Sequence, residues 1–263
     1  MSKKYFIFEK KSELTESVCA KLTEALNKAG FIFDAKAPDF VISVGGDGTF
    51  LKAVKEYCDF KPVFAAINCG NLGFLSEYKS SEVDVLISDL INENLALKEI
   101  KVLEAKFNKK VHYAFNEFRI QSANHETIDL AITINGQYLE TLRGNGCCIS
   151  STYGSSGLNR SLGGAIINHD LDLIELTEMA PVQNAYFRTI SAPLILGSDA
   201  TIGLTNTNHR KIVICYDSAS EILDDNGEEL LFSYSTKSVK MLKNKNNNYV
   251  KKLREAFIND KSN

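Results

Sequence analysis

Strand-like and helix-like patterns alternate along the first hundred residues. Short apolar runs typical of buried strands occur at 4–8, 40–44 and 63–67. Between and after them, apolar residues recur every three or four positions, which is the spacing of an amphipathic helix. Ser12 and Gly30 are typical start and stop residues for the first helix. The other helices are predicted at 49–57 and from Ser80 or Ser81 to about residue 91. This alternation predicts parallel βαβ units.

From about residue 100 the pattern changes to short runs in which apolar and polar residues alternate, separated by turn signals such as Asn135-Gly136. Such a stretch predicts a two-sheet β-sandwich. Helical spacing returns at 249–258, and this lone helix needs a packing partner because a single short helix is marginal in water. The predicted fold is therefore a Rossmann-like parallel α/β domain (1–98) and a β-sandwich domain (99–239), with the C-terminal segment 240–263 returning to the first domain.

Charge and cysteine use narrow the function classes. The chain has 263 residues, a net charge of −3 and a pI of about 5.9, which does not favour binding to nucleic acid. Its apolar runs are far too short to span a membrane, and its N-terminus has no export signal. Six cysteines without metal spacing indicate free thiols in the cytoplasm. The four histidines are scattered, so we predict no metal site formed by the protein itself.

A glycine-rich turn, Gly45-Gly46-Asp47-Gly48-Thr49, directly follows the apolar run at 40–44. Glycine tolerates close approach of a ligand, and ligands of open α/β sheets bind at the carboxyl ends of strands. The turn therefore indicates a phosphate lying against main chain. Asp47 would act beside it as a base or as a carboxylate facing a metal. Taken alone, the turn also fits an ordinary helix cap.

A second glycine loop, at 68–75, follows the next predicted strand. It contains Asn68, Gly70, Gly73, Phe74 and Leu75. Because neighbouring parallel strands end at the same edge of a sheet, the two loops are expected to form a cleft.

Together these segments resemble the NAD kinase family. The resemblance rests on the turn at 45–49, the loop at 67–75, the pair Asn116-Glu117 and two later segments, at 143–164 and 187–194. The matches run from about residue 40 to residue 195 in the family's order. The resemblance implies the same layout as the pattern above, namely an α/β domain, a β-sandwich and a returning C-terminal helix.

The resemblance also implies a reaction, the transfer of the γ-phosphoryl group of ATP to the 2′-hydroxyl of the adenosine ribose of NAD, giving NADP. Asp47 is then the base that accepts the hydroxyl proton, with an ordinary pKa of about 3.9. Mg²⁺, or another divalent cation, is expected on the phosphates of ATP. Asn116 and Glu117 suit the adenine edge and ribose hydroxyls. Arg143 suits either a phosphate or a surface carboxylate. The remaining residues implied to contact nucleotide are Gly45, Gly46, Gly48, Thr49, Lys52, Asn68, Gly70, Gly73, Phe74, Leu75, Asn145, Ser150, Tyr153, Ser156, Gly157, Leu158, Asn159, Ser161 and Ala180.

Two positions depart from the family pattern in the part implied to hold the dinucleotide. Asn145 stands where the family has Asp, so it adds no charge to balance the cationic nicotinamide ring. Leu158 stands where the family has a tyrosine, and Tyr153 lies five residues earlier.

Three functions remain open from the sequence. An NAD kinase is favoured. A non-catalytic NAD(P)-binding relative is motivated by Asn145 and Leu158, and a lipid (diacylglycerol-type) kinase shares the first glycine loop. The donor is ATP or polyphosphate, and the family resemblance implies a dimer or tetramer.

Overall fold

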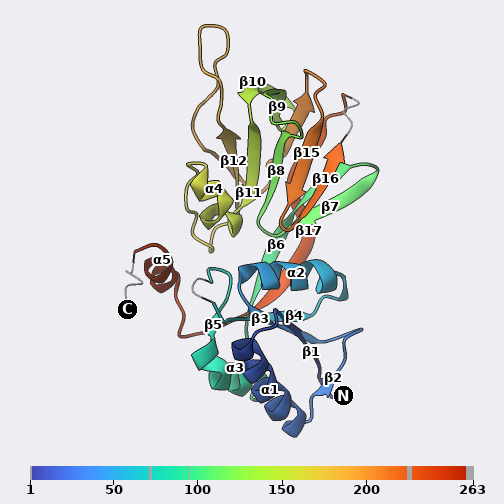
Figure 1. Ribbon diagram of the computed structural model, residues 1–263, viewed down its shortest axis with the longest axis vertical. Helices are drawn as coiled ribbons and strands as arrows, with labels where there is room; N and C mark the ends of the chain where they lie inside the picture. The colour runs from blue at the N-terminus through green and yellow to red at the C-terminus, as the bar shows by residue number, and fades with distance from the viewer. Residues whose placement is uncertain (1, 71–72, 94, 224–226, 259–263) are drawn as a thin grey trace. The chain divides into compact units, whose positions relative to one another are not determined.

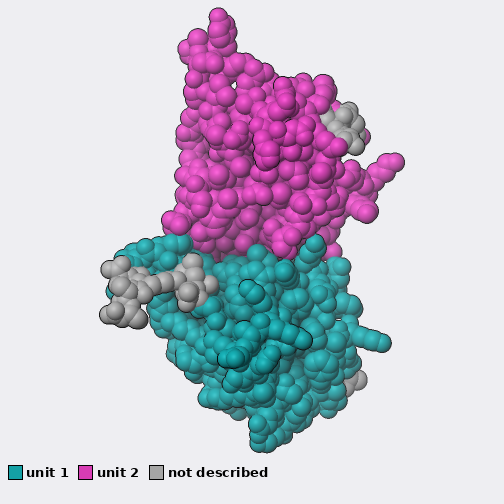
Figure 2. Space-filling model, viewed as in Figure 1, with its two compact units in different colours: residues 1–100, 238–263 teal, residues 101–237 magenta. Residues whose placement is uncertain are grey.

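The computed structural model describes residues 2–70, 73–93, 95–223 and 227–258. The chain divides into two compact units (Figure 2). Unit 1 contains residues 1–100 and 238–263, and unit 2 contains residues 101–237. Among the helices of the described residues, none is both long and apolar enough to cross a membrane.

Unit 1 is a parallel α/β fold, as the alternating pattern predicts. Its sheet has the strand order β4-β3-β1-β2, all parallel, and the short β5 also pairs with β4. Helices α1 and α3 pack together on one face of the sheet, and α2 covers the other (Figure 1). The strands are β1 (Lys4–Glu9), β2 (Ile32–Phe33), β3 (Phe40–Gly45), β4 (Val63–Asn68) and β5 (Tyr78–Lys79). The helices are α1 (Glu13–Lys28), α2 (Asp47–Tyr57), α3 (Val83–Ile91) and α5 (Tyr249–Phe257).

Local sequence accounts for the ends of these helices. Ser12 caps α1 by accepting a hydrogen bond from the Thr15 amide, and Gly30 follows the helix with a φ of 81°. Helix α2 begins two residues earlier than predicted, because Gly46 is its N-cap and Asp47 already lies in its first turn. The Asp47 carboxylate therefore lies near the positive end of the helix dipole.

Unit 2 is rich in antiparallel sheet. One sheet has the order β13-β12-β11-β8-β15-β16, and the other includes β10-β9-β14 and the first part of β17. The long strand β17 continues into unit 1, where Lys240 and Met241 pair with β4. The strands are β6 (Ala96–Phe107), β7 (Lys110–Ala114), β8 (Glu117–Ser122), β9 (Ile128–Ile134), β10 (Gln137–Gly144), β11 (Gly146–Ser151), β12 (Leu173–Met179), β13 (Leu194–Gly197), β14 (Ile202–Asn206), β15 (Ile212–Tyr216), β16 (Ala219–Leu223) and β17 (Leu230–Lys243), and α4 is a single turn (Leu158–Ser161).

Alternating apolar positions of both sheets contribute to one buried core in unit 2. Ile149 and Ile214 come from one sheet, and Leu130 and Ile202 from the other, and all four are fully buried. Strands β13 and β16 were not predicted. Both are edge strands, and each pairs with one neighbour in its sheet.

Candidate active site

The turn after β3 brings Asp47 into position. Gly45 has a φ of 156°, and a Cβ atom added there would lie 2.4 Å from the hydroxyl of Thr49. Glycine is therefore required at this position by the fold itself. At Gly46 and Gly48, by contrast, an added Cβ would meet nothing within 4 Å. These two residues leave an open surface of main chain at the N-terminus of α2, where an anion is favoured.

The Asp47 carboxylate joins the two glycine loops. Its two oxygens accept hydrogen bonds from the main-chain amides of Phe74, at 2.8 Å, and Leu75, at 3.2 Å. The two loops, which follow the neighbouring strands β3 and β4, therefore meet, as the sequence predicts. Burial raises the pKa of Asp47 above its ordinary value, while the two amides and the charge of Lys252 oppose the rise. The sequence-based expectation of an ordinary pKa is thus wrong, because it could not include this burial.

The second loop is fixed by its own side chains. The Asn68 side-chain oxygen accepts a hydrogen bond from the Gly70 amide at 2.9 Å, and a Cβ on Gly73 would lie 2.8 Å from the Asn68 side chain. Asn71 and Leu72, which complete this motif, lie outside the described residues. Lys52 is exposed on α2.

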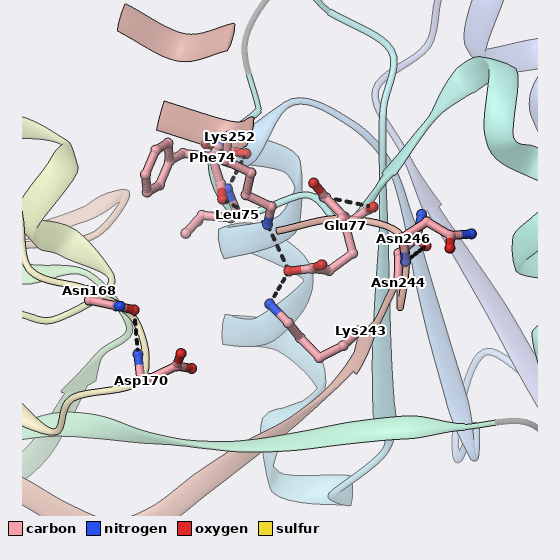
Figure 3. A network of polar contacts seen from close by, with 11 residues as sticks. Phe74, Leu75, Glu77, Asn168, Asp170, Lys243, Asn244, Asn246 and Lys252 are labelled. Carbon is pink, nitrogen blue, oxygen red and sulfur yellow. Dashed lines mark hydrogen bonds and ion pairs between the residues drawn. The ribbon is translucent and has the colours of Figure 1, made fainter. Parts of the chain in front are cut away.

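A buried ion cluster lies beside this loop and was missed by the sequence reading (Figure 3). Glu77, which is 1% exposed, accepts hydrogen bonds from Lys243 and from Lys252. Lys252 belongs to α5, whose Tyr249 also packs against the Phe74 ring. Val250, predicted on the apolar face of this helix, is 64% exposed. The other predicted positions, Leu253, Ala256 and Phe257, are half-buried, so hydrophobic spacing was wrong at Val250 and missed the buried lysine.

In unit 2, Asn116 and Glu117 lie at the start of β8. The Asp217 carboxylate accepts hydrogen bonds from the amides of Phe115, at 2.7 Å, and Asn116, at 2.8 Å. The Asn116 side-chain oxygen and one Glu117 oxygen are buried without a hydrogen-bond partner among the described residues. Burial, and next the charge of Asp217, raise the pKa of Glu117 to about 7, while Arg119 opposes the rise. Asp217 was also missed, because about a hundred residues separate it from the strand that it supports.

The serine- and glycine-rich segment after β11 packs directly on Asn116. The Ser151 amide donates to the Asn116 carbonyl oxygen at 2.8 Å, and a Cβ on Gly154 would lie 2.3 Å from the same oxygen. Ser150 donates its hydroxyl proton to the Ser151 carbonyl oxygen. The buried Tyr153 ring stacks on His169 at a centroid distance of 4.1 Å.

Asn159 makes its side-chain hydrogen bonds within the protein. It is fully buried, its amide nitrogen donates to Glu175 at 2.7 Å, and its oxygen accepts from Thr177 at 2.7 Å. Both ends of the side chain are therefore engaged within the protein. The other predicted residues of the segment differ in exposure: Ser156 and Leu158 are half-buried, and Gly157 and Ser161 are exposed.

Arg143 pairs with a carboxylate. Its guanidinium forms a two-pronged ion pair with Asp129 and lies 4.1 Å from the centroid of the Phe187 ring. Of the two alternatives left open by the sequence, the structure shows the carboxylate. Asn145 is exposed in the turn after β10, and its amide donates to the Met179 carbonyl oxygen. Ala180 is exposed, with a φ of 46°.

Comparison with known proteins bears on both units. The model of the ATP-NAD kinase N-terminal domain matches residues 7–95, and the model of the C-terminal domain matches residues 115–244. NAD kinase 1 of Bacillus anthracis is 32% identical over 266 residues, covering 98% of this chain and all of the relative. The chain belongs to the NAD kinase family. The NAD kinase of Lactobacillus acidophilus is 33% identical over 254 residues, 94% of each chain.

Two solved structures of NAD kinase relatives share the fold. The NAD kinase of Archaeoglobus fulgidus, in complex with ATP, has a TM-score of 0.80 at 21% identity and covers 96% of this chain and 99% of its own. Yeast NADH kinase, complexed with NADH, has a TM-score of 0.82 at 19% identity and covers 98% of this chain and 89% of its own.

Proposed function

We propose that this chain is an ATP-dependent NAD kinase, which transfers the γ-phosphoryl group of ATP to the 2′-hydroxyl of the adenosine ribose of NAD and releases NADP. Family membership over nearly the whole length supports this function. The observation that carries it is the Asp47 carboxylate, held by the Phe74 and Leu75 amides where two glycine loops meet. A lipid kinase would need the first loop but not this second one.

Asp47 acts as the base for the acceptor hydroxyl. Phosphoryl transfer needs an in-line hydroxyl and neutralised charge more than covalent help. The two amides fix the carboxylate in one orientation, and its raised pKa makes it a better proton acceptor than a solvent-exposed aspartate. General-base help of this kind contributes about 10²–10⁴-fold to the rate.

The donor phosphates lie against the open main chain at Gly46 and Gly48, at the N-terminus of α2. Lys52, on the exposed side of the same helix, adds positive charge. Within the described residues, no cluster of three or more His, Cys, Asp or Glu side chains is placed to hold a metal. Mg²⁺ is proposed to arrive with ATP, and when bound it would neutralise phosphate charge.

The adenosine of NAD is recognised by Asn116 and Glu117. Each presents a buried oxygen that has no hydrogen-bond partner within the described part of the chain, and such oxygens favour a ligand that brings hydrogen-bond donors. The adenine amino group suits the amide oxygen, and ribose hydroxyls suit the carboxylate.

The finer architecture is part of the same proposal. The α/β domain covers 1–98 with 240–263, and 99–239 form a β-sandwich that binds NAD. We further propose a cytoplasmic enzyme that assembles as a dimer or tetramer.

A donor and acceptor panel tests the function. Purified protein is incubated with Mg²⁺, with ATP or polyphosphate as donor and with NAD, NADH or diacylglycerol as acceptor, and products are resolved by chromatography. NADP formed from ATP and NAD is the expected result. Tight NAD binding by calorimetry without NADP formation would instead favour the non-catalytic binding protein that Asn145 and Leu158 motivate.

A further inference from the structure

A lysine of the C-terminal helix is buried beside the loop that holds Asp47. Lys252 of α5 is 7% exposed, although the residue before it, Lys251, is exposed. The Lys252 ammonium donates to the Glu77 carboxylate at 2.7 Å and to the Phe74 carbonyl oxygen at 3.3 Å (Figure 3). A buried ammonium is costly unless it is paired, and here the partner is specific.

The Phe74 carbonyl has a special position, because it belongs to the same peptide unit as the Leu75 amide. That amide donates to Asp47. The chain of contacts therefore runs from Glu77 to Lys252, through one peptide unit, to the Asp47 carboxylate. A cation at the carbonyl end polarises the peptide and strengthens the donor at its amide end.

We infer that Lys252 is a positioning residue for Asp47, and that docking of α5 completes the catalytic loop. The inference rests on the proposed function only in assigning the base to Asp47; the contacts themselves are independent of it.

Two further observations support this role. The Phe74 side chain is held by aromatic rings from the same helix, with Tyr249 at a centroid distance of 6.0 Å and Phe257 at 5.7 Å. Lys243 and Lys252 both donate to Glu77, and although burial lowers the pKa of Lys252, Glu77 and Asp47 oppose that shift. Lys252 thus fixes both the geometry and the local charge of the loop, from a position 178 residues after Phe74.

Substitutions of Lys252 and Glu77 distinguish a role in positioning Asp47 from a role in stabilising the fold alone. Lys252→Met removes the charge and keeps the length and helix propensity of the side chain, and Lys251→Met is the matched control on the same helix. Glu77→Gln removes the carboxylate that accepts a hydrogen bond from Lys252 and opposes the lowering of its pKa. The readouts are the amide proton shift of Leu75 by NMR, which needs no activity, and the pH profile of kcat for NADP formation.

In Lys252→Met we expect the Leu75 amide proton to move upfield, kcat to fall about tenfold with KM little changed, and the acid limb of the profile to rise by about half a pH unit. Glu77→Gln should move the acid limb in the opposite direction, because it removes a negative charge near the Asp47 carboxylate. Lys251→Met should match the wild type in every readout.

The inference is overturned if the amide proton shift of Leu75 and the acid limb of the pH profile are unchanged in Lys252→Met and Glu77→Gln. It is also overturned if the acid limb moves in the same direction in the two variants. Should Lys252→Met fail to fold, the Glu77→Gln shift decides alone. If the wild type forms no NADP, the proposed function fails, and the Leu75 amide still tests the contact chain.

Discussion

Asp47 in unit 1 and Glu117 in unit 2 are both partly buried carboxylates with raised pKa values, but their hydrogen-bond partners and neighbouring charges differ. Asp47 receives two main-chain hydrogen bonds and lies near a buried lysine. Glu117 has a buried oxygen without a partner among the described residues and faces a second carboxylate, Asp217. Main-chain amides thus oppose the rise in the pKa of Asp47, whereas in the proposed function the ligand supplies the donor that the Glu117 oxygen lacks among the described residues.

The difference has a physical consequence for each step of the reaction. A carboxylate held by the protein is oriented before substrate arrives, which favours catalysis. A carboxylate with an unmet hydrogen-bonding capacity gains most when a ligand supplies donors, which favours binding. Unit 1 should accordingly control turnover, and unit 2 should control affinity for NAD.

Replacing Asp47 should have the largest effect on this contrast. Asp47→Asn removes the base and leaves one of the Phe74 and Leu75 amides facing another donor. We expect kcat to fall about 10²–10⁴-fold with little change in NAD affinity. Turnover and calorimetric NAD binding are measured on the same preparation, with thermal unfolding as the control for folding. Turnover within a few-fold of the wild type would show that Asp47 is not the base.

Glu140, a buried carboxylate of unit 2, should make the stability of the protein depend on pH. Glu140 and Glu178 are both less than a tenth exposed, and Glu140 accepts a hydrogen bond from the Ile190 amide. Burial and the neighbouring Glu178 raise the pKa of Glu140 to about 7. Because the folded protein holds the Glu140 proton more tightly than the unfolded chain does, this group contributes to stability at low pH. The contribution is fully present below the ordinary pKa of 4.5 and is lost as the pH rises through about 7.

The matching variant is Glu140→Gln, whose neutral amide can donate to Glu178. Allowing for solvent screening, we expect it to raise the free energy of unfolding by about 1–2 kcal/mol at pH 8 and by much less at pH 5. Urea unfolding at the two pH values measures the difference, and Glu16→Gln, on the exposed face of α1, is the control. An equal effect at both pH values would mean that Glu140 is not protonated in the folded protein.

The smallest effect is expected at Asn145, which is exposed. Asn145→Asp adds one negative charge where the cationic nicotinamide ring is expected. We predict an NAD affinity about two- to fivefold tighter, because exposed charge pairs contribute little. Asn124→Asp, also exposed in unit 2, makes the same change in net charge and should leave the affinity unaltered. Weaker binding in Asn145→Asp would place the nicotinamide elsewhere.

The sequence was most informative where a site is built from local patterns. The turn after β3 and the loop after β4 both follow strands whose apolar runs are easily recognised, and the structure shows that the two loops are in contact at Asp47. What could not be predicted depends on distant contacts. Lys252 lies on the buried face of α5, where hydropathy favours Val250, and Asp217 supports a strand about a hundred residues away.

The burial of individual polar side chains could not be predicted from the sequence either. Asn159 matches the family pattern as a nucleotide contact, but Glu175 and Thr177 occupy both ends of its amide. The pKa values of Asp47 and Glu117 depart from their ordinary values mainly because of burial, which only the folded chain defines.

Proton release on NAD binding tests the contrast between the two units most directly. Because the pKa of Glu117 is about 7, the free protein holds about half a proton there at pH 7, and ribose hydroxyls that donate to the carboxylate should expel it. Calorimetry of NAD binding at pH 7 in two buffers of different ionisation enthalpy gives the number of protons released. We predict about 0.5 for the wild type and close to zero for Glu117→Gln. No release by the wild type, or equal release by the variant, would contradict the account.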